Sequence, residues 1–188
     1  SVPVSPVSAA NQVKGTWIEQ AEALKEEAME SMKRGDDVAA EKQLYSALKL
    51  YLANNPPAGL DLMDSLFVLH MSQADSYMQM GKSDRAGQSF KKVLTVSHHS
   101  NLLLAKLKRF EELARAKMAQ GSHLLSIDPE GHVNMVETLL RDTLTLCEEH
   151  PKEIKPATKI EAQLSLAKLH LELETEAREQ ERNQREQE

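Results

Sequence analysis

An alanine followed seven residues later by a glycine occurs three times in this chain, each time toward the end of a helix-forming stretch. A glycine adopts the left-handed conformation at little cost, so it readily ends a helix. Apolar residues at three- and four-residue steps follow the first two of these glycines and predict a second helix. The repeated unit is therefore a pair of helices joined by a tight turn. The three pairs of residues are Ala28 and Gly35, Ala74 and Gly81, and Ala114 and Gly121.

Composition points to an all-α fold with about seven antiparallel helices. Aromatic residues make up only 4% of the chain, and strong helix formers dominate it. Further breaks are expected at the prolines of 54–59, at the sequence SHHS of 97–100, at a longer loop over 121–132 and at Pro151. We expect helices near residues 16–34, 36–53, 60–80, 83–96, 101–120, 133–149 and 157–173.

The domain organisation is expected to have three parts. Residues 1–14 are rich in Pro, Ser and Val and uncharged until Lys14, which is typical of a disordered linker. Residues 15–173 are predicted to form one helical repeat domain. Residues 174–188 lack large apolar side chains and are predicted to be a charged helical or disordered tail. The alternative for this tail is a specific acidic docking segment.

Charge and cysteine content exclude several function classes. The formal net charge of −6 argues against nucleic-acid binding, which normally needs a basic face. No run of about 18 apolar residues occurs, so no membrane insertion is expected. The single Cys147 allows no internal disulfide, which favours an intracellular location, cytoplasmic or nuclear.

The second helix of each unit repeats small and large apolar residues at matching distances from the glycine. Ala40 and Ala86 follow their glycines by five residues, and Leu44 and Phe90 follow them by nine. This pattern resembles the tetratricopeptide repeat (TPR), a helix-turn-helix of about 34 residues. The resemblance covers residues 21–52 and 67–98, and residues 107–151 match only in their first helix.

The resemblance implies a right-handed α-solenoid with a concave groove, closed by a capping helix at 157–173. In the TPR family the first helix of each repeat lines the groove, which receives a peptide or a partner helix. Members that clamp acidic chaperone tails use Asn and Lys there, whereas this chain has Met29, Asp75, Val68 and Ser72, so that ligand is not expected. The resemblance assigns the groove to Lys25, Met29, Met32, Lys33, Val68, Met71, Asp75, Met78, Gln79, Lys108, Glu111, Arg115 and Met118.

Methionine is prominent on this expected surface, which holds five of the chain's eight methionines. Thioether side chains are flexible and polarisable, which suits a groove that adapts to apolar anchors. The alternative is that these methionines fill gaps in the core between long helices.

No residue pattern predicts catalysis, a cofactor or a metal. His98 and His99 are adjacent and would diverge on a helix, and the other histidines lack ligand spacing. The sequence GKS at 81–83 lacks the glycine that a phosphate-binding loop needs at position 76. Cys147 lies on an apolar helix face and is expected to be a buried structural thiol.

The expected function is a non-catalytic protein-interaction or scaffold module that binds a partner peptide or helix in the groove. The alternative is a self-associating structural domain that forms a homodimer through the broad apolar face of 157–173. A helical domain that presents helix pairs to membrane-trafficking partners is a third possibility.

Overall fold

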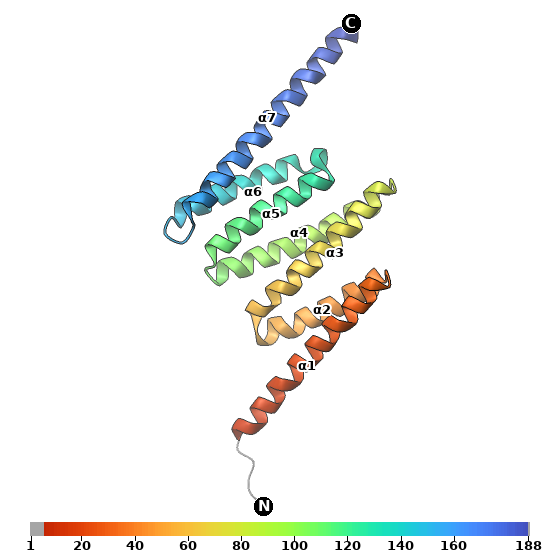
Figure 1. The fold of residues 1–188 in the computed structure, drawn as a ribbon, viewed down its shortest axis with the longest axis vertical. Coiled ribbons are helices and arrows are strands. Elements are labelled where there is room, and N and C mark those ends of the chain that lie inside the picture. Colours follow the sequence, from red (N-terminus) through yellow and green to blue (C-terminus); the bar gives the residue numbers. More distant parts are fainter. Residues whose placement is uncertain (1–5, 188) are drawn as a thin grey trace, which may run out of the picture. The chain divides into compact units, whose positions relative to one another are not determined.

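The chain folds into helices joined by short turns (Figure 1). The structure is a computed structural model that describes the backbone of residues 6–187 and the side chains of residues 16–187. No strand occurs in this range, so the predicted all-α fold class is confirmed. The elements are α1 (Pro6–Lys33), α2 (Asp37–Asn54), the 3-10 turn η1 (Pro56–Ala58), α3 (Gly59–Gln79), α4 (Ser83–Lys106), α5 (Phe110–Ile127), α6 (Pro129–Glu149) and α7 (Pro156–Gln187).

These helices form two compact units, Ser1–Leu103 and Leu104–Glu188. In the first unit, α2 packs against both α1 and α3. In the second unit, α6 packs against α5 and α7, and α7 also contacts α5. The boundary between the units lies within α4, and the single repeat domain expected over 15–173 stays a prediction.

Small residues allow the helices of each unit to approach closely. The side chains of Ala28, Ala74 and Ala114, one from each repeat, are all fully buried. Leu44 and Phe90, which were expected to fill the space beside such contacts, are buried too. The predicted burial of the three alanines is confirmed.

Two of the predicted glycine turns have the expected geometry. Gly35 and Gly81 adopt φ angles of +74° and +70° at the ends of α1 and α3. At Gly81 the N–H of Lys82 donates to the carbonyl of Tyr77 at 2.8 Å, and the N–H of Gly81 donates to that of Met78 at 3.0 Å. This pair of bonds is the Schellman motif, which satisfies the last carbonyls of a helix. The side chain of Asp36 then caps α2 by accepting from the N–H of Ala39.

The turn between α4 and α5 has no glycine and lies elsewhere than predicted. Residues 97–100 do not break the chain, because α4 continues through them to Lys106. The helix ends instead at Lys108, which has a φ of +55°. The N–H of Arg109 donates to the carbonyl of Leu104 at 3.0 Å, as in the glycine turns. Lys108, an expected groove residue, is therefore the left-handed residue of a helix cap.

Gly121 does not end a helix. It lies inside α5, where a Cβ would approach the side chain of Val136 on α6 to 3.2 Å. The glycine therefore serves the α5–α6 contact, and the loop expected over 121–132 is mostly helical. The break comes at Asp128, whose carboxylate accepts from the N–H of Gly131, with Pro129 as the first residue of α6.

The N-terminal end of the described chain is more helical than predicted. Residues 6–14, expected to be linker, belong to α1. Proline is well accommodated in a first helical turn, which lets the helix begin at Pro6. Residues 1–5 of the expected linker lie outside the described residues. The charged tail is helical to Gln187, one of the two states predicted for it, and carries an ion pair between Glu174 and Arg178 at 3.7 Å.

Replacing Lys108 by glycine should raise the free energy of unfolding by up to about 1 kcal/mol, because a side chain with a Cβ is disfavoured in the left-handed region. The matched control is Lys49→Gly in the middle of α2, which should lower it by about 1 kcal/mol. Chemical denaturation monitored by circular dichroism measures both. Equal destabilisation by the two substitutions would contradict the helix cap at Lys108.

Candidate functional site

An aromatic cluster joins the N-terminal part of α1 to the end of α2. Trp17 meets Tyr51 edge to face, with ring centroids 5.4 Å apart. The Tyr51 hydroxyl donates a hydrogen bond to Glu22, which raises the pKa of Tyr51 to about 12 and lowers that of Glu22. Lys25, an expected groove residue, lies over the Tyr51 ring with Nζ 5.8 Å from its centroid. Lys25 therefore contributes to the α1–α2 contact.

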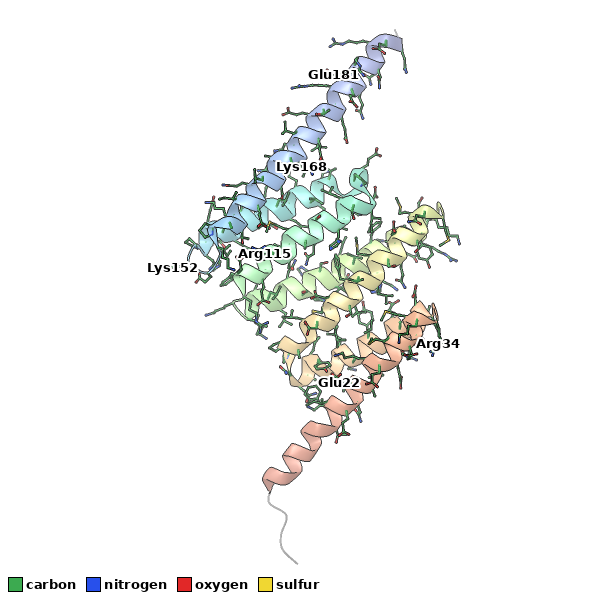
Figure 2. The ribbon with its side chains drawn as sticks, viewed as in Figure 1. Glu22, Arg34, Arg115, Lys152, Lys168 and Glu181 are labelled. Atoms are coloured by element: carbon green, nitrogen blue, oxygen red, sulfur yellow. The ribbon has the colours of Figure 1, made fainter. Side chains whose placement is uncertain are left out.

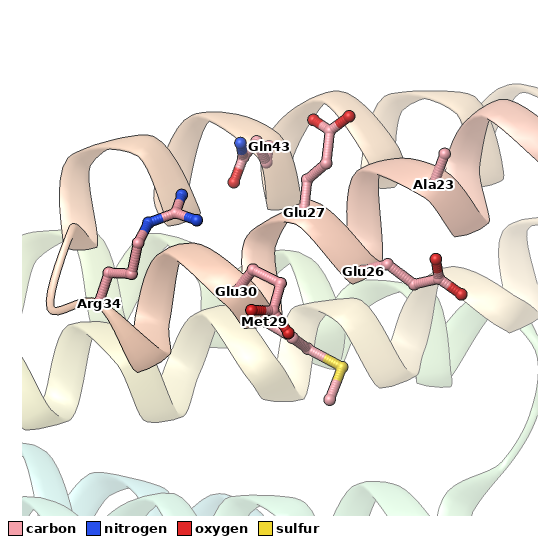
Figure 3. A pocket seen from close by; sticks show the side chains of 7 residues that line it. All are labelled: Ala23, Glu26, Glu27, Met29, Glu30, Arg34 and Gln43. Carbon is pink, nitrogen blue, oxygen red and sulfur yellow. The ribbon is translucent and has the colours of Figure 1, made fainter.

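The C-terminal half of α1 leaves apolar side chains in solvent. Met29 is 55% exposed and Met32 is 37% exposed, whereas Lys33 pairs with Glu30 at 3.0 Å. Met29 borders a shallow surface cavity of about 700 Å³, together with the carboxylates of Glu26 and Glu30 (Figure 3). The face of α1 that was expected to line the groove therefore has an apolar centre with charged side chains at its margin.

The matching face of α3 is also partly apolar. Val68 is 64% exposed and Met78 is 37% exposed, and they fall on the same side of the helix as Asp75. Asp75 accepts a hydrogen bond from Gln79 at 3.0 Å. Met71 lies between them in sequence, but its side chain is buried. The structure therefore places Met71 in the core, and Val68 and Met78 in solvent.

A buried histidine joins α3 to α2 within the same unit. His70 has no exposed surface, and its Nε2 lies 3.2 Å from the hydroxyl of Tyr45. Its Nδ1 lies 3.1 Å from the Gln73 side-chain oxygen. A neutral imidazole, with one donor and one acceptor, satisfies both partners. Burial lowers the pKa of His70, which keeps the ring neutral near pH 7 despite the nearby carboxylate of Glu41.

In the second unit, Glu111 of α5 fixes the start of α7. Its carboxylate accepts from the backbone N–H of Lys155 at 3.1 Å and from the Thr158 hydroxyl at 2.6 Å. Arg115 lies 3.0 Å from the same carboxylate and 3.6 Å from Glu161 of α7. Burial would raise the pKa of Glu111, but these hydrogen bonds and the arginine lower it below its usual range. Glu111 and Arg115, both expected to line the groove, therefore contact α7 or the residue before it.

Met118, the last expected groove residue, also faces α7. It borders a cavity of about 160 Å³ together with Leu140 of α6 and Leu169 of α7. Figure 2 shows Arg115 on α5 and Lys168 on α7 within this unit. The third expected segment of the groove is therefore the surface on which α7 packs.

Glu26 and Glu27 leave α1 in different directions (Figure 3). Cys147 is buried, as predicted, and burial raises the pKa of its thiol, which disfavours the reactive thiolate. Over residues 16–187 no three His, Cys, Asp or Glu side chains gather as metal ligands. Among the described helices, none is long and apolar enough to cross a membrane.

Comparison of the chain with known protein families, curated proteins and solved structures found no match. The residues that connect the helices were missed by sequence reasoning. Lys92 of α4 pairs with Glu41 of α2 at 2.8 Å, and Thr158 bonds to Glu111 across 47 positions of sequence. Such long-range partners leave no local periodicity, so no signal in a single sequence could have indicated them.

Substituting Glu111 by alanine should lower the free energy of unfolding by about 1–3 kcal/mol, because the Lys155 amide and the buried Thr158 hydroxyl lose a charged acceptor. The matched control is Glu112→Ala at the neighbouring exposed position, which should change it by about 0.5 kcal/mol or less. Thermal and chemical denaturation measure both values. Similar losses in the two variants would contradict the role of Glu111.

Acidification should destabilise the first unit through His70. Because burial lowers its folded-state pKa, the unfolded chain binds this proton more readily, and stability falls as pH decreases below the ordinary histidine value of about 6.5. Glu22, Glu111 and Glu137 have lowered pKa values and lose their contributions only at pH values near and below the ordinary glutamate pKa. Denaturation of the chain and of His70→Gln between pH 5 and 8 isolates the histidine contribution, and a titration of the His70 ring by NMR near or above pH 6.5 would contradict it.

Proposed function

We propose that this chain is a non-catalytic protein-interaction module, in which α1 and α3 bind an apolar-anchored peptide or helix of another protein. The observation that carries the proposal is the exposure of Met29, Met32, Val68 and Met78 on these two helices. Apolar side chains of this size are often buried, and their exposure along a helix face favours an interaction surface.

The chemistry of these side chains suits an amphipathic partner. Three of the four are methionines, whose flexible thioethers adapt to different apolar anchors. Lys33 and Glu30 lie at the margin on α1, and Asp75 lies on the α3 face, which gives polar contacts around an apolar centre. The resemblance to TPR hairpins supports the same helices as the binding elements.

The surface proposed here is smaller than the thirteen residues expected from the resemblance. Met71 is buried, Lys108 caps a helix, and Glu111, Arg115 and Met118 face α7. Lys25 contacts Tyr51. The proposed site therefore rests on the exposed residues of α1 and α3 alone, within the first unit.

Val68→Glu should abolish partner binding without affecting the fold, because it places a charge in the centre of the apolar face while its side chain packs against little. Val38→Glu on α2 is the matched control, since Val38 is a still more exposed valine, at 79% against 64%. Affinity capture with the full chain and both variants should show partners retained by the control and weakened about tenfold or more by Val68→Glu.

Circular dichroism should show equal helicity in the three proteins, and Met29→Glu should reproduce the loss seen with Val68→Glu. Retention of the same partners by Val68→Glu, or their loss with Val38→Glu, would overturn the proposed site.

A further inference from the structure

A stripe of apolar side chains runs along α7 and faces away from the unit to which the helix belongs. Ile160 is 55% exposed, Leu164 is 65% exposed and Leu171 is 63% exposed, with Ala167 exposed between them. Their steps of four, three and four residues keep them within an arc of about 60°, at about 100° of rotation per residue. The stripe therefore forms one continuous line along the helix.

The opposite side of α7 holds the helix to α5 and α6. Thr158, Ala162 and Leu169 are buried there, and Thr158 is bonded to Glu111. The exposed stripe thus plays no part in the core of the second unit. A four-three-four spacing of apolar residues is the a and d pattern by which two helices form a coiled coil.

We propose that a second copy of this chain covers the stripe, with the two α7 helices antiparallel around a two-fold axis. Ile160 then lies opposite Leu171 of the second copy, and Leu164 lies opposite Ala167. A two-fold contact of this kind is self-complementary, because the same residues are used on both sides. The surface is distinct from the α1 and α3 residues of the proposed function.

Charges beyond the stripe decide in favour of the antiparallel direction. The same helical line continues as Glu174, Arg178, Glu181 and Arg185. A parallel pair would place each of these against its own copy, glutamate on glutamate and arginine on arginine, which is strongly unfavourable at a helix contact. In the antiparallel register, Arg178 and the residues after it extend past the start of the opposing helix and stay in solvent.

The start of α7 is basic and a later segment of the helix is acidic, so two antiparallel copies bring opposite charges together. The segment around its start carries Lys152, Lys155 and Lys159 with Glu153 as its one acidic residue, and residues 172–176 carry Glu172, Glu174 and Glu176. Antiparallel pairing brings these two segments to the same level, with Lys159 opposite Glu172 and Lys155 opposite Glu176. The acidic segment also meets the positive end of the helix dipole.

Beside the stripe, the antiparallel register brings one further pair of opposite charges together. Within the chain Glu161 pairs with Arg115 at 3.6 Å and Lys168 with Glu172 at 3.9 Å. Glu161 and Lys168 lie on the same flank of α7, and the antiparallel register brings Glu161 of one copy near Lys168 of the other. Lys168 is exposed on α7, and Glu181 lies on the part of the helix that extends beyond α5 and α6 (Figure 2).

Sedimentation of the full chain at about 1–100 µM tests the contact, because specific dimers of this kind associate in that range. The wild-type chain should sediment with the mass of two chains, and Leu164→Glu should halve that mass with its helicity by circular dichroism unchanged. Val38→Glu is the control, since it adds the same charge at another exposed apolar residue and should remain dimeric. A monomeric wild type, or a dimer in Leu164→Glu, overturns the proposal.

Disulfide cross-linking tests the direction. A mixture of Ile160→Cys and Leu171→Cys chains should form mixed cross-linked dimers, whereas Ile160→Cys chains alone should not, because about eleven residues of helix, or roughly 16 Å, separate the two positions. Cys147 is buried, so the wild-type chain serves as the background. Efficient self-cross-linking of Ile160→Cys would overturn the antiparallel register.

Val68→Glu, which tests the proposed function, should leave both the dimer and its cross-linking unchanged. The two proposals therefore fail or succeed separately.

Discussion

The contact between helices at alanine is the constraint on which both units depend. Ala21 and Ala28 of α1 and Ala40 and Ala47 of α2 are fully buried in the first unit, where α1 packs against α2, and Ala114 and Ala162 are fully buried in the second unit. With no side chain beyond Cβ, these positions let helix backbones approach closely, and the larger Leu44 and Phe90 fill the space beside such contacts. A single hairpin cannot bury such a face by itself, so each unit needs a third helix, and α3 and α7 supply it.

Hydrogen bonds to the buried side chains of His70 and Thr158 then help to determine which helices meet. His70 is satisfied by Tyr45 and Gln73, and Glu111 is satisfied by the Lys155 amide and Thr158. A buried polar group without a partner is costly, so these bonds favour one arrangement of α2 with α3 and of α5 with α7. The contact at Glu111 also has a functional consequence, because α7 occupies the face of α5 that a TPR-like groove would have used. Large apolar side chains remain exposed elsewhere, among them Met29 on α1, Val68 on α3 and Leu164 on α7.

Particular residues show how far the sequence could be interpreted. Gly35 and Gly81 were predicted as left-handed helix caps and adopt that conformation, because glycine is the residue that does so at least cost. Gly121 looked the same in sequence but lies inside α5, since its missing Cβ makes room for Val136. Lys108 ends a helix without any signal in its residue type. The expected groove was also predicted only in part. Residue spacing placed Met29 and Met71 on one surface, but in the folded chain Met29 is exposed and Met71 is buried.

The sequence by itself determined the all-α class, the helical hairpins with their alanine contacts, and the apolar character of α7, because these follow from local propensity and from the 3.6-residue period of the helix. The tertiary structure decided the division into two units, the helix ends at Lys108 and Asp128, and the choice of which apolar side chains remain in solvent. Those features depend on residues that are distant in the chain, such as Glu111 and Thr158, and such pairs leave no trace in the period of a single helix.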